Sequence, residues 1–139
     1  MIDNDSQAAT QVPITVTFDA TQPEGSRFTW SPNAPPVVAS LPVVTNGSSS
    51  YALVFTLVSP NSPGAVWSAA PMSWRDGDPP PPADADSIMP SPGANQFMVG
   101  VKNTNQRNEP EKFGFKVSVD YNGSAFTSPD PEVVLQPPS

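Results

Sequence analysis

The densest group of side chains able to bind a ligand lies between residues 67 and 78, where two tryptophans, an arginine and two aspartates follow closely. Indole rings stack on the apolar faces of sugars, and aspartate and arginine hydrogen-bond to sugar hydroxyls. With a third tryptophan, this combination predicts a ligand-binding site made of Trp30, Trp67, Trp74, Arg75, Asp76 and Asp78. The alternative is structural: Trp67 fills the core of the domain, and Trp74 anchors the segment that follows it.

Further aspartates follow this group, and their oxygen atoms are the hard ligands that Ca²⁺ prefers. Asp76-Gly77-Asp78 resembles the start of an EF-hand loop, and Asp84 and Asp86 come next. The four prolines 79–82 interrupt the pattern, and the closing glutamate of an EF-hand is missing. We therefore expect no metal site here. A solvated acidic loop that hinders edge pairing and keeps the protein soluble accounts better for these residues.

The common nucleophile systems are excluded, because the chain contains no histidine and no cysteine. Ser-His-Asp and Cys-His catalysis needs histidine, and the usual zinc and iron–sulfur sites need histidine or cysteine. Two carboxylates can act in glycoside hydrolysis, and Glu109 and Glu111 would face the same side of an extended backbone. Nothing in the sequence places them against a cleft. We expect a non-enzymatic protein without a cofactor, with a carboxylate-based enzyme as the weaker alternative.

The net charge of −7, from six Lys and Arg against 13 Asp and Glu, limits the classes of partner. An acidic chain repels the phosphates of nucleic acids and of anionic membranes, so neither is expected as a partner. No apolar run reaches the ~18 residues of a membrane span, and the first residues lack the features of a signal peptide. We expect a cytoplasmic protein, or an exported one if a leader has been removed.

Proline makes up 20 of the 139 residues, nearly three times its usual share of about 5%. Proline in a helix interior costs about 3 kcal/mol, which argues against a helical protein. Most of the prolines separate short apolar runs, as expected for a single β-domain over residues 1–139. Two parts differ: we expect a flexible N-terminus at 1–11 and a long proline- and aspartate-rich loop at 70–95.

Alternation of apolar and polar residues predicts seven to nine short strands and no amphipathic helix. The most apolar run, 50–59, is expected to be a central strand. Pro13, near the start of 12–18, favours an edge strand or a first-residue position. Asn122-Gly123 between two alternating runs is a strong hairpin signal. The other predicted strands lie at 27–30, 37–44, 65–69, 96–103, 113–121, 124–127 and 132–135. This pattern predicts an all-β, immunoglobulin-like two-sheet β-sandwich with Greek-key order.

The C-terminal part of the chain carries a family resemblance. Residues 113–123, followed by Ser128-Pro129-Asp130-Pro131-Glu132, resemble the closing hairpin of the DP-EP family of small bacterial β-sandwich proteins. Asp130-Pro131-Glu132 carries most of the resemblance, which is confined to this hairpin. Members of the family have no established activity, so the resemblance implies an all-β fold and a bacterial protein but no catalytic residues.

The strands near the chain ends offer a route to assembly. One of the segments 14–18 and 133–135 is expected to form the edge of a sheet, and an open edge accepts another strand through backbone hydrogen bonds. We therefore expect a binding or assembly module whose surface is the 70–95 loop together with an open edge. Its partner would be another protein or another copy of the chain. A carbohydrate-binding module is the alternative, and it requires Trp74 to be exposed beside polar neighbours.

Overall fold

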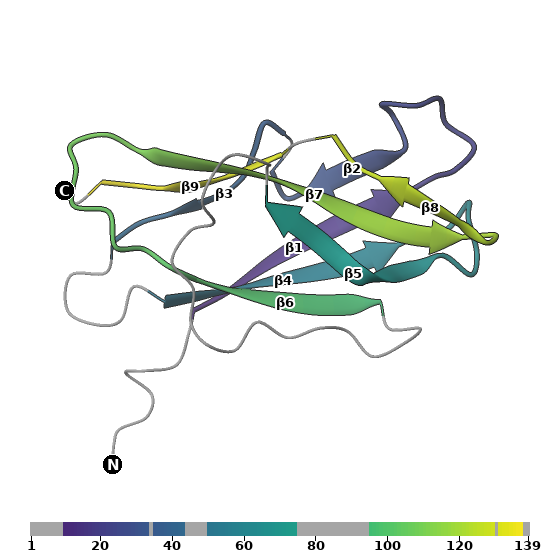
Figure 1. The fold of residues 1–139 in the computed structure, drawn as a ribbon, viewed down its shortest axis with the longest axis horizontal. Coiled ribbons are helices and arrows are strands. Elements are labelled where there is room, and N and C mark those ends of the chain that lie inside the picture. The colour runs from purple at the N-terminus through teal and green to yellow at the C-terminus, as the bar shows by residue number, and fades with distance from the viewer. Residues whose placement is uncertain (1–9, 34, 44–49, 75–94, 130, 138–139) are drawn as a thin grey trace, which may run out of the picture.

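The computed structural model describes residues 10–33, 35–43, 50–74, 95–129 and 131–137 (Figure 1). These residues form nine β-strands in two open sheets of four and five strands, and they contain no helix. The arrangement is consistent with a two-sheet sandwich, which confirms the predicted all-β class. The strands are β1 Thr10–Phe18, β2 Phe28–Ser31, β3 Val37–Leu41, β4 Ser50–Val58, β5 Val66–Trp74, β6 Gln96–Lys102, β7 Glu111–Tyr121, β8 Ser124–Thr127 and β9 Glu132–Leu135.

The first sheet has the strand order β2-β1-β4-β6, with β1 parallel to β4 and β6 antiparallel to β4. β4 therefore lies inside the sheet, as predicted for residues 50–59. Its odd-numbered side chains, such as Leu53 and Phe55, are buried in the core, while Val54 and Thr56 on the other face are only partly covered. This alternation is the physical basis of the strand pattern seen in the sequence.

β1 also lies inside the first sheet and begins at Thr10, so neither prediction for Pro13, an edge strand or the first residue of a strand, is correct. Pro13 is accommodated because β2 is short and pairs with β1 only from Thr15 onward. At Pro13, β1 has a paired strand on one side only, where Val54 of β4 is its partner. Sheets accept proline at such positions because, on the side without a neighbouring strand, the missing N–H breaks no hydrogen bond between strands.

The second sheet has the strand order β3-β9-β7-β5, and β8 pairs with β7 as well. β9 pairs with residues 111–114 of β7, and β8 pairs with residues 118–121, so the two short strands occupy successive stretches of one long strand. On its other side β9 pairs in parallel with β3. The segment 133–135 is therefore an interior strand, and the prediction that one of the two terminal segments forms an edge is wrong for both.

β5 extends into the predicted loop at 70–95, because it continues to Trp74. Its register with β7 shifts between Trp67 and Met72, and Pro71 lies inside this irregularity. A bulge tolerates proline because the ladder is already interrupted there. β1 likewise begins at Thr10, inside the predicted flexible N-terminus. Asn95, at the end of the predicted loop, is described as well, whereas residues 75–94 and 1–9 lie outside the described residues.

The turn between β7 and β8 is Asn122-Gly123, as the sequence predicts. Both residues have positive φ angles, 53° and 77°, which a type I′ turn requires and which asparagine and glycine tolerate. The turn pairs Tyr121 with Ser124 and fixes the register of the hairpin. A second Asn-Gly pair, at 46–47, lies outside the described residues.

One aromatic cluster joins the two sheets. The fully buried Phe115 of β7 makes edge-on contacts with Phe55 of the first sheet at 5.7 Å, with Trp30 at 5.9 Å and with Trp74 at 5.8 Å between ring centroids. Phe55 stacks in turn on Phe97 of β6 at 4.7 Å. Each such pair adds about 0.5–1.5 kcal/mol beyond the burial of its area. β6 is therefore fixed to the common core through Phe97.

Two buried asparagines tie the end of β6 to the second sheet. Asn103 Nδ2 donates to the carbonyls of Leu41 at 2.8 Å and Gln136 at 3.1 Å. Asn105 Nδ2 donates to the carbonyl of Leu135 at 3.0 Å, and its backbone N–H donates to Asn103 Oδ1 at 2.9 Å. The two amides therefore satisfy buried carbonyls at the ends of β3 and β9. They attach the segment that follows β6 to the second sheet.

Candidate binding site

Two of the three tryptophans of the predicted binding group are core residues. Trp30 is 9% exposed and Trp67 is 4% exposed. The indole N–H of Trp67 donates to the carbonyl of Asn95 at 2.9 Å, and its ring meets Phe97 edge-on at 4.7 Å. These contacts correspond to the structural alternative for Trp67, in which the indole fills the core.

Trp74 is half-buried at the end of β5, where its ring packs on Phe115. Trp30 contacts the same phenylalanine, so the structure brings these two indoles to one core residue, while Trp67 packs on Phe97 instead. The remaining members of the predicted group, Arg75, Asp76 and Asp78, lie outside the described residues. A carbohydrate site at Trp74 and its neighbours stays a prediction.

The carboxylates of the described residues do not gather into a metal-binding group. Within the described ranges, no set of three or more acidic side chains could hold a metal ion. Asp84 and Asp86, the other members of the calcium hypothesis, lie outside these ranges. The same ranges contain no helix that is long and apolar enough to cross a membrane.

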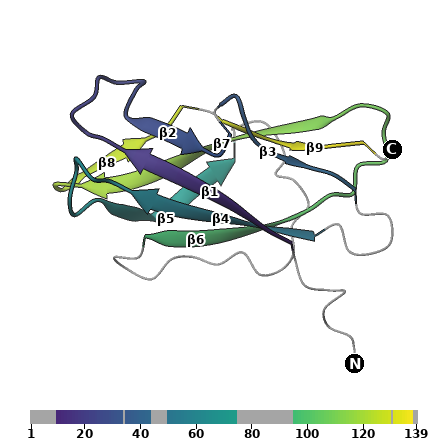
Figure 2. The same ribbon diagram turned by 180° about the vertical axis from the view of Figure 1, so that it is seen from behind.

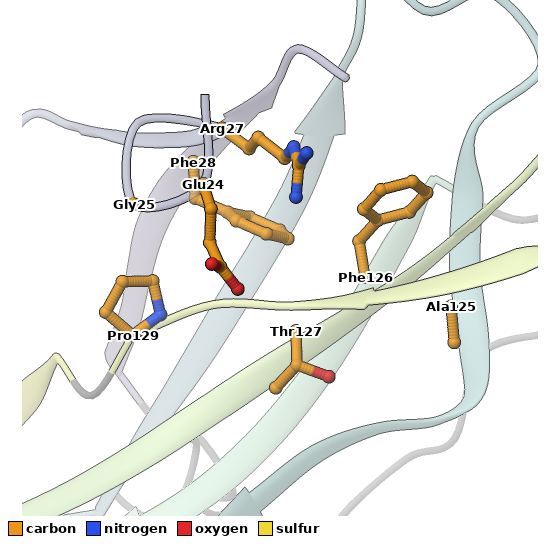
Figure 3. Close-up of a pocket in the computed structure, with 8 residues that line it drawn as sticks. All are labelled: Glu24, Gly25, Arg27, Phe28, Ala125, Phe126, Thr127 and Pro129. Atoms are coloured by element: carbon orange, nitrogen blue, oxygen red, sulfur yellow. The ribbon is translucent and has the colours of Figure 1, made fainter. Parts of the chain in front are cut away.

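A hollow of about 220 Å³ lies between the loop that precedes β2 and strand β8 (Figure 3). The guanidinium carbon of Arg27 lies 5.3 Å from the centre of the Phe126 ring. Arg27 Nε donates a hydrogen bond to the backbone carbonyl of Gln22 at 3.1 Å. Figure 3 shows the side chains of Glu24 and Arg27 facing the same space. The lining residues are Glu24, Gly25, Arg27, Phe28, Ala125, Phe126, Thr127 and Pro129.

This hollow offers one charge of each sign beside an aromatic ring, so it has room and chemistry for a small zwitterionic group. The Arg27 guanidinium, however, is already engaged by the ring of Phe126 and by a backbone carbonyl. Sequence reasoning missed the hollow, because its two walls come from segments that are far apart in the chain and share no motif.

The loop that forms one wall of the hollow is anchored by Asp19. Its carboxylate accepts hydrogen bonds from Thr21 Oγ1 at 2.6 Å, Asn61 Nδ2 at 3.1 Å and the Thr21 backbone N–H at 2.9 Å. These donors, first the Thr21 hydroxyl and then Asn61, lower the pKa of Asp19 from 3.8 to about 2. The anchored loop is thereby tied to the β4–β5 connection, where Ser62 Oγ accepts from the N–H of Ala20 at 2.8 Å.

A different kind of site lies along β6, where one hydrogen bond shows which way the backbone points. The N–H of Leu57 donates to the carbonyl of Asn95 at 2.7 Å, and this pair continues the register that sets Thr56 opposite Gln96. In an antiparallel pair, such hydrogen-bonded positions alternate with positions whose backbone groups point away from the partner strand. The backbone groups that point away from β4 therefore belong to Gln96, Met98, Gly100 and Lys102.

β6 is the outermost strand of the first sheet, as Figure 1 and Figure 2 show. No strand among the described residues pairs with its outer side. β6 is seven residues long, contains no proline, and keeps an unbroken register with β4 from Gln96 to Lys102. It therefore presents a continuous row of backbone donors and acceptors.

The other edge strands are protected in familiar ways. β2 and β8 have four residues each, and β2 ends directly before Pro32. β3 has a register shift between Val37 and Ala39, and β5 has a register shift around Pro71. Short length, bulges and proline are devices by which proteins prevent unwanted pairing at sheet edges. β6 has none of the three, so it is the edge best suited to accept another strand.

No family model matches the chain, and no curated protein matches it. The resemblance of the C-terminal hairpin to the DP-EP family therefore stays a prediction.

Proposed function

We propose that the chain is a non-enzymatic binding or assembly module that accepts a strand of a protein partner at the edge of β6. The observation that carries this proposal is the regular seven-residue edge, whose outward backbone groups lie at Gln96, Met98, Gly100 and Lys102. A strand laid beside β6 would pair with these groups and extend the first sheet from four strands to five.

We also propose that the scaffold is an immunoglobulin-like sandwich with Greek-key order. The strand order supports this: the chain passes from one sheet to the other at every connection from β2–β3 to β6–β7. Connections of this kind place loops at the two ends of a sandwich and leave the edge strands accessible. In the proposed scaffold, the partner strand would therefore bind at the accessible edge of β6.

The side chains beside the edge would select the partner. On the outer face of the first sheet, Met98 lies opposite Val54, and Gln96 lies opposite Thr56. Gln96 Nε2 donates a hydrogen bond to the Thr56 hydroxyl at 3.0 Å. The four strands of this sheet contain a single charged residue, Lys102. A surface with so few charges favours an extended segment with apolar and hydroxyl side chains.

Selection of random displayed peptides on the immobilised chain tests the proposal. Bound peptides should bind at least about tenfold more weakly to the variant Met98→Pro, which lacks one outward N–H but keeps the ladder with β4. Met98→Thr is the matched control, because it shortens the side chain and keeps the N–H, so it should retain binding. An absence of enriched peptides, or equal loss in both variants, would contradict binding through the backbone of β6.

A further inference from the structure

We infer that the strand accepted at β6 is the β6 strand of a second copy of the chain, paired antiparallel about a two-fold axis at Val99. This inference rests on the proposed strand addition and names its partner. Two first sheets would then join into one continuous sheet of eight strands, because each contributes four.

The backbone of β6 is compatible with itself in this register. Pairing about Val99 places Met98 of one copy opposite Gly100 of the other, and Gln96 opposite Lys102. These are the positions whose N–H and C=O groups point away from β4, so each copy meets the outward groups of the other. The two Val99 residues then occupy a non-hydrogen-bonded position, where opposing Cα atoms lie about 4.5 Å apart.

The side chains fit the same register. The long side chain of Met98 lies beside Gly100, which has none, so the pair avoids a clash on the outer face. Lys102 lies opposite Gln96, so no like charges face each other across the junction, which would be destabilising. Both ends of the junction are equivalent, as two-fold symmetry requires.

Charge also favours this place for contact between copies. Each copy carries a net charge of −7, so two copies repel each other at most approaches. The strands of the first sheet contain no acidic residue, and their single charge is the positive Lys102. Pairing two β6 strands therefore joins two sheets whose strands carry no acidic residue.

Single-cysteine variants test the register directly, because the chain contains no cysteine of its own. Val99→Cys should form a disulfide-linked dimer under mild oxidation, since a disulfide needs Cα atoms roughly 4.4–6.8 Å apart. Lys102→Cys is the matched control on the same strand. In the proposed register the two Lys102 positions are six residues apart along the strand, about 20 Å, and cannot be bridged.

The control is stringent, because Lys102 is exposed and Val99 is half-buried. Random collision would cross-link Lys102→Cys faster, so faster dimer formation by Val99→Cys supports the two-fold register. Equal or faster cross-linking of Lys102→Cys would overturn it. Circular dichroism of both reduced variants should match that of the original chain, which shows that the comparison is made between folded proteins.

Sedimentation of the original chain separates this inference from the proposed function. A concentration-dependent dimer that Met98→Pro abolishes and Met98→Thr retains supports both. A chain that stays monomeric up to millimolar concentration overturns the second-copy inference. If displayed peptides still bind and depend on the N–H of Met98, strand addition stands with another partner. If they do not, the proposed function is overturned as well.

Discussion

The two sheets of the molecule differ in charge and in the protection of their edges. The strands of the first sheet contain one charged residue, whereas those of the second contain five, four on β7 and one on β9. In the second sheet the edge strands β3 and β5 have broken registers and β8 has only four residues, while the first sheet ends on one side in the regular strand β6. Short strands and broken registers hinder pairing with other strands, and among the described residues β6 has neither.

This difference is informative because both sheets share one core and one chain. A need for stability alone gives no reason to protect one sheet and leave the other open. Natural β-proteins usually protect their edges, because an unprotected edge invites pairing with another chain. A regular edge on a sheet whose strands carry no acidic residue is what the proposed addition of a partner strand requires.

The largest effect is expected where the two sheets meet. Phe115→Ala should lower the free energy of unfolding by about 3–5 kcal/mol, because it removes a ring that contacts Phe55 and Trp30 of the first sheet. Urea unfolding followed by tryptophan fluorescence measures this loss. The half-buried Phe113 on the same strand provides the control, and Phe113→Ala should cost less. Two separate unfolding transitions in the original chain would show that the sheets do not share a core.

An effect of intermediate size on stability is predicted from the directions in which the backbone N–H groups of β6 point. Val99→Pro removes an N–H that points toward β4, so it should destabilise the fold by about 1–3 kcal/mol more than Met98→Pro, whose N–H points outward. Chemical denaturation of the two variants, compared with the original chain, gives the difference. Equal destabilisation would mean that the outward row has been assigned to the wrong residues.

The smallest effect concerns the acidic group nearest the first sheet, Asp19, which lies directly after β1. Its pKa of about 2 in the folded state lies below the ordinary value of 3.8. A carboxyl with a lowered pKa stabilises the fold above pH ~4, and this contribution is lost as the pH falls through about 2. Thr21→Val removes the hydroxyl donor that contributes most to the lowered pKa of Asp19 and should therefore raise this pKa, as measured by NMR titration of the Asp19 carboxyl carbon. An unchanged pKa would contradict the hydroxyl's role.

Local features of the fold could be predicted from the sequence, because they depend on neighbouring residues. The alternation from Phe113 to Tyr121 defines β7, and Asn122-Gly123 defines the hairpin, since few other residue pairs take two positive φ angles. The order of strands within the sheets was not predictable in this way. Pro13 indicated an edge, yet β1 is interior, because the shortness of β2 leaves space that periodicity does not reveal.

The candidate site was less predictable than the fold. A tryptophan has the same side chain whether it covers a core or carries a ligand, so Trp30 and Trp67 suggested a platform although they are buried. Their neighbours contained a clue: Trp30 alternates with Phe28, which places both on the core face of β2. The open edge of β6 is a property of strand order, and strand order depends on contacts between residues distant in the chain.

The parallel pair β3–β9 has a consequence for the time course of folding. It joins residues 37–41 to residues 132–135, so one of its strands is made early and the other late. Closing so long a loop costs entropy before its contacts form, and chains rich in such distant pairs fold slowly. The β7–β8 hairpin can form at once, whereas β3 must wait for β9 to emerge from the ribosome. During that interval the edge of β3 that later pairs with β9 has no strand beside it, and an unpaired strand edge makes a partly folded chain prone to aggregation.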